Sequence, residues 1–245
     1  MTAEDINPYD DNRSKTDQVR EMFDNIAPAY DRLNRAMSFG LDRSWRRLAV
    51  GLVADTKPRH IVDIATGTGD FAISLAKHIT GAKITGIDLS ENMVEIGRRK
   101  VTDAGLADRI TMMVDDVLNS QLPEGCADAV TVAFGVRNFE HLLEAYSKIL
   151  HILRPGGMLC VIELSTPTSS LVKPFYNLYT RKIIPLLGRK ISKDNRAYSY
   201  LPESIAAVQQ GDEMLEVMRR AGFASTRYRR LTFGVCTIYQ AIRPL

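Results

Sequence analysis

The sequence predicts an α/β protein built around a doubly wound, mostly parallel sheet that ends in an antiparallel hairpin. Three observations support this fold class. Apolar, β-branched runs alternate with helix-forming segments from about residue 61 onward. A glycine-rich turn follows the first of these runs. Near the end of the chain, two strand-like runs, Thr226–Leu231 and Val235–Ala241, flank a turn near Phe233 and Gly234.

Two amphipathic helices are expected before the first strand. Their apolar residues recur at helical spacing: Val19, Met22, Phe23 and Ile26 in the first, then Trp45, Leu48, Ala49, Leu52 and Val53 in the second. Residues 25–43 connect the two helices. This connection mixes turn residues with polar side chains, including those of Tyr30 and Asp31, and such a mixture is typical of the edge of a pocket.

Five strands and the helices between them are expected before the terminal hairpin. The strands begin with residues 61–63 and continue with Lys83–Ile87, Ile110–Val114, Ala129–Phe134 and Met158–Leu164. Ser90 can cap a helix that runs to about Asp103. Residues 140–153 should form another helix, and the sequence Arg154-Pro155-Gly156-Gly157 should end it. Residues 213–221 should form the last helix.

Composition excludes several classes of protein. The 245 residues are 45% hydrophobic and 25% charged, and the net charge of +3 is too small to indicate nucleic acid by itself. Cys126, Cys160 and Cys236 are widely spaced in apolar contexts, so we expect reduced core residues, no disulfide framework and no metal site. No apolar run is long enough to span a membrane and the N-terminus is polar, so we expect a cytoplasmic protein.

The most informative segment is the glycine-rich turn and the acid that follows it. Gly67 and Gly69 let the backbone approach a ligand closely, because a Cβ at either position would collide with it. Asp88 ends the next strand about 20 residues later, where a βαβ unit presents an acid to the two hydroxyls of a ribose. These residues predict a nucleoside site.

Three interpretations of the nucleoside site are open on these residues. Asp63 precedes the glycines at the end of the first strand, where it would repel a pyrophosphate and attract an ammonium group, and this favours S-adenosyl-L-methionine. Gly67, Gly69 and Ala72 also satisfy G-x-G-x-x-A, so a dinucleotide is the competitor. An ordinary turn without a ligand is the third.

Acids recur at the predicted strand ends, where ligands of such sheets bind. Asp116 follows the third strand and could accept a hydrogen bond from an adenine amino group, while the amide of Val117 meets a ring nitrogen. Thr68 could bind the amino-acid part of the cofactor, or it could simply stabilise the turn.

Over nearly its whole length the chain resembles the UbiE/MenG family of S-adenosylmethionine-dependent quinone C-methyltransferases. The matching blocks are VREMFDNIAPAYDRLN, VDIATGTGDFA, GIDLSENM, AVTVAFGVRNF, LRPGG, AYSYLPESI and LTFGVCTIYQA. The glycine motif occurs in many methyltransferases, whereas MFDNIAPAYDRLN, FGVRN and YSYLPESI together are specific to this family. The resemblance implies a Rossmann-like class I methyltransferase fold with a seven-stranded sheet.

The resemblance also implies a substrate and a set of cofactor contacts. The acceptor would be a ring carbon of a polyprenylated quinol, with demethylmenaquinol favoured and 2-methoxy-6-polyprenyl-1,4-benzoquinol as the alternative. Ala65 stands where many methyltransferases have a first glycine, and Ala133 stands where some relatives have a serine. By this match, the cofactor contacts fall on Thr68, Asp88, Asp116 and Val117.

The reaction needs an electron-rich ring carbon, and ionising a quinol hydroxyl at neutral pH costs roughly 4 kcal/mol. Arg137, at the end of the fourth strand, could stabilise the resulting phenolate, and Asn138 could orient its oxygen. Arginine rarely gives up its proton, so Arg137 alone is a poor base. Tyr30, Asp31 and Tyr200 are the candidate bases or orienting groups, although buried structural hydrogen bonding is the common role of such residues.

We expect one methyltransferase domain over residues 1–245: a helical cap (1–57), a cofactor-binding core (58–164), a lid insertion (165–210) and a C-terminal helix and hairpin (211–245). In the lid, residues 171–200 hold seven basic residues and one acid among aromatic and apolar side chains. One interpretation is a lid that admits a lipid-tailed substrate and touches the anionic inner face of a membrane. The other is a solvated helical cap. The basic residues are Lys173, Arg181, Lys182, Arg189, Lys190, Lys193 and Arg196.

Two further functions fit parts of the sequence. A basic, aromatic lid also suits a nucleic-acid methyltransferase, but Phe134-Gly135-Val136-Arg137 lacks the prolines that base N-methylases usually carry after the fourth strand, so no nucleic-acid partner is expected. A non-catalytic binding module is disfavoured because the glycines and acids of the cofactor motif are intact. Nothing in the sequence indicates the oligomeric state.

Overall fold

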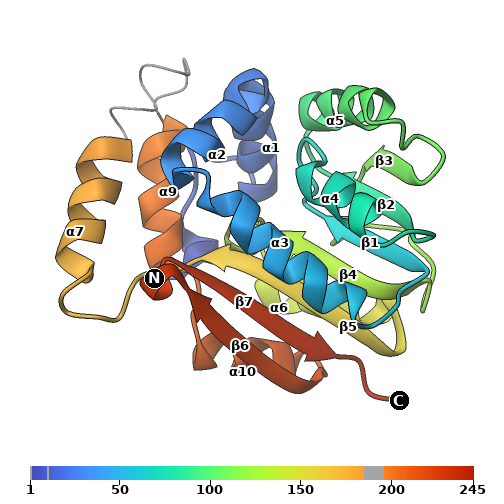
Figure 1. Ribbon diagram of the computed structural model, residues 1–245. Coiled ribbons are helices and arrows are strands. Elements are labelled where there is room, and N and C mark those ends of the chain that lie inside the picture. Colours follow the sequence, from blue (N-terminus) through green and yellow to red (C-terminus); the bar gives the residue numbers. More distant parts are fainter. Residues whose placement is uncertain (1, 10, 185–195) are drawn as a thin grey trace.

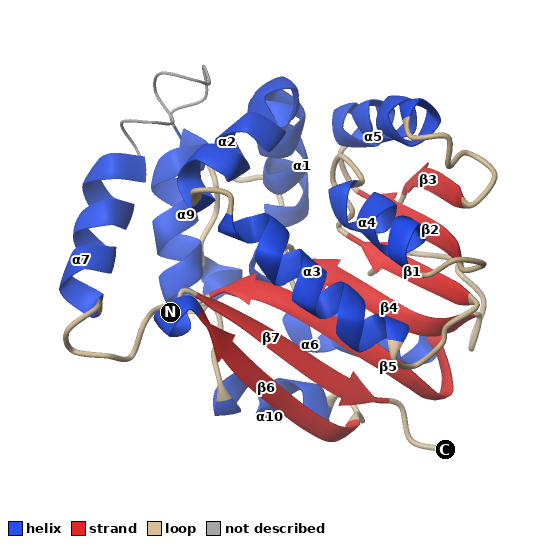
Figure 2. Ribbon diagram, viewed as in Figure 1, coloured by secondary structure: helices blue, strands red, loops and turns tan. Residues whose placement is uncertain are grey.

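The centre of the molecule is a seven-stranded sheet, seen in a computed structural model that describes residues 2–9, 11–184 and 196–245 (Figure 2). The strand order is β3-β2-β1-β4-β5-β7-β6, and only β7 runs antiparallel to its neighbours. This arrangement confirms the doubly wound fold with a terminal hairpin. The strands are β1 His60–Ile64, β2 Lys83–Asp88, β3 Ile110–Val114, β4 Ala127–Ala133, β5 Leu153–Leu164, β6 Ala224–Leu231 and β7 Cys236–Ile242.

Helices cover both faces of the sheet, so its central strands are apolar on both sides, as expected for parallel strands. On β1, Ile61 belongs to the apolar cluster beneath α3, α4 and α5, and Val62 belongs to the cluster beneath α6 and α10. The three helices on the first face are α3 Leu41–Ala54, α4 Asp70–His78 and α5 Glu91–Asp103. The two on the second face are α6 Leu142–Ile152 and α10 Asp212–Arg220.

A third apolar cluster lies above the carboxyl ends of the strands. There α1 Lys15–Ile26, α2 Tyr30–Ser38 and α9 Arg196–Ala207 pack together, with α7 Lys173–Leu178 beside them (Figure 1). Met93 of α5 joins this cluster and ties it to the sheet layer. Of the segment expected to form the N-terminal cap, α1 and α2 lie in this cluster, whereas α3 packs on the sheet.

Local structure differs from expectation in two places, and part of one expected segment lies outside the described residues. The connection expected between the first two helices contains α2, a helix that begins at Tyr30 after a short 3-10 turn. β5 begins at Leu153, which already pairs with Ala127, and a register shift accommodates the Pro-Gly-Gly sequence expected to precede the strand. Part of the lid lies outside the described residues, including Leu186, Leu187, Arg189, Lys190 and Lys193.

Candidate functional site

The sheet reverses its winding direction between β1 and β4, and ligands of doubly wound sheets bind at this point. The residues just after the two strands, Ala65 (φ 52°) and Phe134 (φ 62°), both have left-handed backbone conformations without being glycine. Such residues cost roughly 1–2 kcal/mol each, and strain of this kind concentrates at functional sites. The β1 and β4 ends are therefore shaped at some cost to stability.

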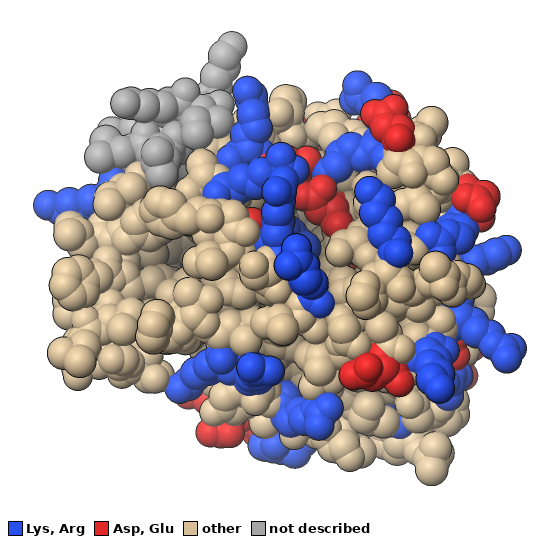
Figure 3. All heavy atoms as spheres, viewed as in Figure 1, with Lys and Arg blue, Asp and Glu red and all other residues tan. Residues whose placement is uncertain are grey.

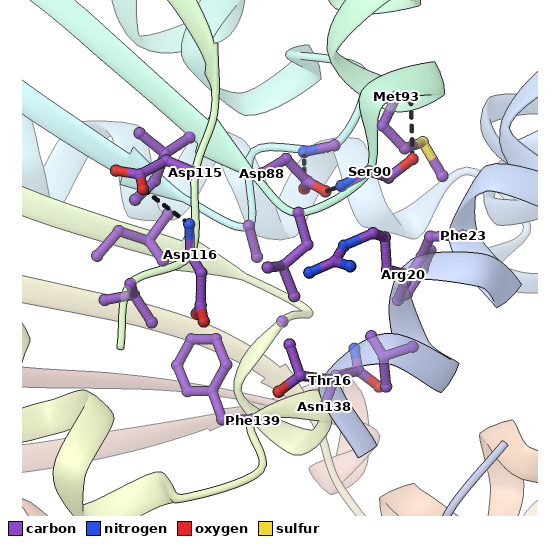
Figure 4. A pocket seen from close by; sticks show the side chains of 18 of the residues that line it. Thr16, Arg20, Phe23, Asp88, Ser90, Met93, Asp115, Asp116, Asn138 and Phe139 are labelled. Atoms are coloured by element: carbon purple, nitrogen blue, oxygen red, sulfur yellow. Dashed lines mark hydrogen bonds between the residues drawn. The ribbon is translucent and has the colours of Figure 1, made fainter. Parts of the chain in front are cut away.

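A pocket opens along the ends of β1, β2, β3 and β4, and we call it the strand-end pocket. It encloses about 750 Å³ of open space, including its mouth. Figure 4 shows Asp88, Ser90 and Asp116 on the sheet side and Thr16, Arg20 and Phe23 of α1 opposite them. Helix α1 therefore forms one wall of the pocket.

Asp88 is held in place by the backbone. The Gly67 amide donates to one carboxylate oxygen (2.7 Å) and the Ser90 amide donates to the other (3.0 Å). Burial raises the pKa of Asp88 to about 6, against the opposing effect of these amides. Each oxygen keeps a lone pair, so the carboxylate can accept hydrogen bonds from two adjacent hydroxyls.

The glycine turn lies beside Asp88, and Gly67 has a φ of +56°. A Cβ added there would lie 3.7 Å from the Tyr30 ring and would narrow the pocket. Asp116 and Val117 lie at the β3 end of the same pocket, where the carboxylate of Asp116 accepts from the Leu118 amide (3.1 Å). The structure thus brings Gly67, Asp88, Asp116 and Val117 to one pocket.

Asp63 is a buried acid, and it does not line the strand-end pocket. Its two oxygens accept hydrogen bonds from Thr66 (2.6 Å) and Thr131 (2.5 Å). Burial raises its pKa to about 6. It lines a small adjoining cavity together with Gly67, Thr68 and Arg46.

Thr68 and Asp31 belong to an ion-pair network around that small cavity. The Thr68 hydroxyl donates to Asp31 (2.6 Å), and Lys100 of α5 binds both Asp31 (2.7 Å) and Asp70 (2.5 Å). Lys100 also donates to the Thr68 hydroxyl (2.9 Å). Asp31 therefore links α2 to the glycine turn and does not line the large apolar pocket described next, although we expected it to be a candidate base.

A larger, mostly apolar pocket adjoins the strand-end pocket, and we call it the apolar pocket. It encloses about 1170 Å³, including its mouth, between α2, α3, the α7 segment, α9 and the hairpin. Tyr30 and Phe134 line both pockets, so the two spaces meet at these side chains. Burial raises the pKa of Tyr30, so its hydroxyl holds its proton at neutral pH.

Arg137 borders the apolar pocket as a buried cation. Its Nη1 donates to Glu163 (2.8 Å) and to the Phe134 carbonyl, while its Nε has no hydrogen-bond partner among the described residues. Glu163 keeps the pKa of this guanidinium raised despite burial. The neighbouring Asn138 lines the strand-end pocket, and its oxygen accepts from the Tyr200 hydroxyl (3.1 Å).

Sequence reasoning missed Glu163 and a second buried arginine, Arg46. Arg46 pairs with Asp42 (2.5 Å) one turn earlier on α3, and its guanidinium lies 5.2 Å from the centre of the Phe134 ring. Its Nε also lacks a partner within the described part of the chain. The Asp–Arg spacing on an amphipathic helix was the one available signal for this pair, whereas nothing local indicated Glu163.

Comparisons with known proteins identify the family of the chain. The model of the ubiE/COQ5 methyltransferase family matches residues 11–243. A demethylmenaquinone methyltransferase of Bacteroides fragilis is 45% identical, over 98% of each chain. The enzyme of the same name from Porphyromonas gingivalis is 43% identical, over 99% of this chain and 100% of its own length. A ubiquinone/menaquinone biosynthesis C-methyltransferase of Geotalea daltonii is 40% identical over 92% of this chain and 96% of that protein.

Solved structures support the fold. The [4+2]-cyclase SpnF aligns with a TM-score of 0.70 at 17% identity, over 94% of this chain and 97% of its own. A SAM-dependent methyltransferase of Aquifex aeolicus aligns with a TM-score of 0.56 at 18% identity, over 76% and 82% of the two chains. At such identities the likeness concerns the fold alone, and it confirms the Rossmann-like methyltransferase architecture.

Proposed function

Because the chain belongs to the ubiE/COQ5 methyltransferase family, we propose that it moves the methyl group of S-adenosylmethionine to a ring carbon of demethylmenaquinol. The observation that carries this assignment is the meeting of two unlike pockets at Tyr30 and Phe134. One pocket has the groups that bind a nucleoside, and the other is an apolar space beside buried cations. The naphthoquinol is preferred to the benzoquinol because relatives at 43–45% identity carry the demethylmenaquinone name.

The strand-end pocket fits the cofactor. Asp88 can accept from both ribose hydroxyls, since two backbone amides already fix its carboxylate. Gly67 leaves room for close approach, and the Asp116 carboxylate with the Val117 amide can bind the adenine edge. Beyond Gly67, the small cavity with Asp63, Thr68 and Arg46 would hold the amino-acid end.

The apolar pocket is the proposed acceptor site. When bound, S-adenosylmethionine supplies an electrophilic methyl group, so that a ring-carbon electron pair forms the new C–C bond while the C–S bond breaks. The protein must hold the ring at the Tyr30–Phe134 junction and exclude water. Positioning the two reactants in this way can by itself lower the activation barrier by many kcal/mol. The ring hydrogen then leaves as a proton that can return to the quinolate oxygen, so that one proton is released to solvent for each methyl group transferred.

Arg137 and Arg46 are proposed to stabilise the quinolate. Both are buried cations that border the acceptor pocket, and neither Nε has a hydrogen-bond partner within the described residues. The carboxylates of Glu163 and Asp42 pair with them and hold them in place. A fixed cation in a water-poor site stabilises a developing oxyanion strongly. Tyr200 orients Asn138 through its hydrogen bond. Tyr30 keeps its own proton, so its role in this proposal is to orient the quinol oxygen by a hydrogen bond and not to act as the base.

We also propose a cytoplasmic location with peripheral contact at the inner face of the membrane through residues 171–200. No helix in the described ranges is long and apolar enough to cross a membrane. All three cysteines are unpaired, as in a reducing compartment. Leu171, Phe175 and Leu178 are exposed in that segment and support the contact.

The test is transfer of a labelled methyl group to three acceptors offered in parallel: demethylmenaquinol, a methoxy-polyprenyl-benzoquinol and bulk RNA. We expect label in the naphthoquinol product. Arg137→Ala should keep its affinity for S-adenosylhomocysteine within about twofold and lose at least about tenfold in turnover, because its guanidinium faces the acceptor side. Label in the benzoquinol or the RNA alone would reject the assignment.

A further inference from the structure

Large apolar side chains are exposed at three sites that are distant in sequence. The α2–α3 turn exposes Phe39 (76%), the start of the α7 segment exposes Leu171 (80%) and Phe175 (75%), and the β6–β7 turn exposes Phe233 (81%). Folding normally leaves single apolar residues exposed, whereas several at neighbouring loop tips indicate an interaction site. We call these three segments the apolar rim.

The apolar rim surrounds the mouth of the apolar pocket. Phe39 and Phe175 line the pocket directly, and Thr232 and Val235 line it on either side of Phe233. Phe39 also contacts the ring of Tyr179, with 5.5 Å between ring centres, which joins the α2–α3 turn to the α7 segment. The pocket therefore opens between apolar side chains that face solvent.

Two rim residues occupy a costly backbone conformation. Phe39 has φ 51° and Phe233 has φ 56°, in the left-handed region that bulky residues rarely adopt. Neither side chain gains burial that would offset this strain, since both are mostly exposed. The left-handed Phe39 caps the end of α2, a role that glycine or asparagine fills at lower cost. The exposed aromatic side chains themselves therefore indicate a contact outside the protein.

Basic side chains border the rim. Arg43 is exposed on the first turn of α3, next to the Phe39 turn, and with the exposed Arg47 it also lines a cavity between α3 and α4. Arg229 and Arg230 are exposed beside the Phe233 turn. On the remaining side, Lys173 is exposed at the start of α7. Figure 3 shows a hollowed, mostly uncharged face beside α7, with one basic side chain projecting at the upper end of α7 and further Lys and Arg over α2, α3 and β6. Apolar tips inside a basic border match an anionic bilayer, whose acyl layer lies beneath negative headgroups.

We propose that the apolar rim docks into the interface of an anionic lipid bilayer, so that the mouth of the apolar pocket opens toward the acyl chains. The aromatic tips enter the headgroup–acyl boundary, and the arginines and Lys173 bind lipid phosphates. A lipid-tailed acceptor then enters the pocket with its tail still in the membrane. This inference rests on the proposed function for its substrate. It extends the contact through residues 171–200 to the α2–α3 turn and the hairpin.

The test uses the double variant Leu171→Ser/Phe233→Ser in the full-length protein, because neither side chain lines a pocket. Leu245→Ser removes a fully exposed leucine at the C-terminus, away from the rim, and is the control for loss of exposed apolar surface elsewhere. Binding is measured by co-sedimentation with vesicles of phosphatidylcholine alone and of phosphatidylcholine with phosphatidylglycerol. We expect wild type and control to bind the anionic vesicles, less so in high salt, and the double variant to bind at least about tenfold more weakly.

Three outcomes would overturn the proposal: no vesicle binding by wild type, equal binding by the double variant, or a lipid-free wild-type dimer that the double variant cannot form. The last would assign the rim to a second copy of the chain. Turnover of a tail-less quinol in solution should be equal in wild type and the double variant, whereas turnover of a long-tailed quinol in vesicles should fall in the variant. If no quinol is methylated, the proposed function fails while the vesicle result stands.

Discussion

Protonation of Asp88 should control cofactor affinity between pH 5 and pH 7. Burial raises the pKa of this carboxyl to about 6, so it takes up a proton as the pH falls through that value. Ribose hydroxyls donate to the ionised carboxylate, and a proton on it removes one acceptor. A group with pKa 6 is about ten-elevenths ionised at pH 7 and one-eleventh at pH 5, so the affinity should fall about tenfold over this range.

The assay is calorimetric titration with S-adenosylhomocysteine at pH 5, 6 and 7. At pH 6 binding should release protons, because the bound hydroxyls favour the ionised form, and the measured heat should change with the ionisation enthalpy of the buffer. Asp88→Asn should bind at least about tenfold more weakly at pH 7 and lose its part of the pH dependence. The pH dependence that remains in the Asp88→Asn variant should come from Asp63, whose pKa is also raised to about 6.

The matched control is Asp116→Asn, which changes a carboxylate of the same pocket and should keep the pH dependence. The reasoning would be refuted by an affinity that stays constant from pH 5 to pH 7. It would equally be refuted if Asp88→Asn kept the full wild-type pH dependence, since the titrating group would then lie elsewhere.

Two further predictions concern buried contacts. Glu163→Gln should lower turnover at least about tenfold while S-adenosylhomocysteine affinity changes less than twofold, because Arg137 loses its buried counter-charge; equal losses in both would assign Glu163 a general structural role. Gly135→Ala should lower the free energy of unfolding by about 1–3 kcal/mol, since the new Cβ would lie 2.6 Å from that of Ala65. Adding Ala65→Gly should recover part of that loss in urea unfolding, and strictly additive effects would contradict the clash.

Local sequence signals predicted the fold, and they predicted that Asp88 and Asp116 would lie at the same edge of the sheet, where both line the strand-end pocket. Strand periodicity and the acids at strand ends located Asp88 and Asp116, because each lies where a strand of a parallel sheet ends. The prediction that Ser90 caps a helix is also confirmed, since the Ser90 hydroxyl accepts a hydrogen bond from the Met93 amide (3.1 Å). Such features depend on residues a few positions away along the chain, so they can be predicted from the sequence alone.

Contacts between distant elements were beyond sequence reasoning. Asp31 was a candidate base, but Lys100 on α5 binds it, and no spacing rule relates those two positions. The same holds for Glu163, which lies at the end of β5 and reaches Arg137 because β4 and β5 are neighbours. Nor does sequence show that Phe39 and Phe233 face solvent, because exposure depends on packing by the rest of the chain.

In the proposed arrangement, the junction at Tyr30 and Phe134 would give the two products separate exits. The spent nucleoside would depart past α1 to the aqueous side, and the methylated lipid would leave between the rim segments. Neither product would then pass through the space that the other occupies. A molecule docked on the bilayer could therefore reload from the aqueous side and begin another turnover without detaching from the lipid.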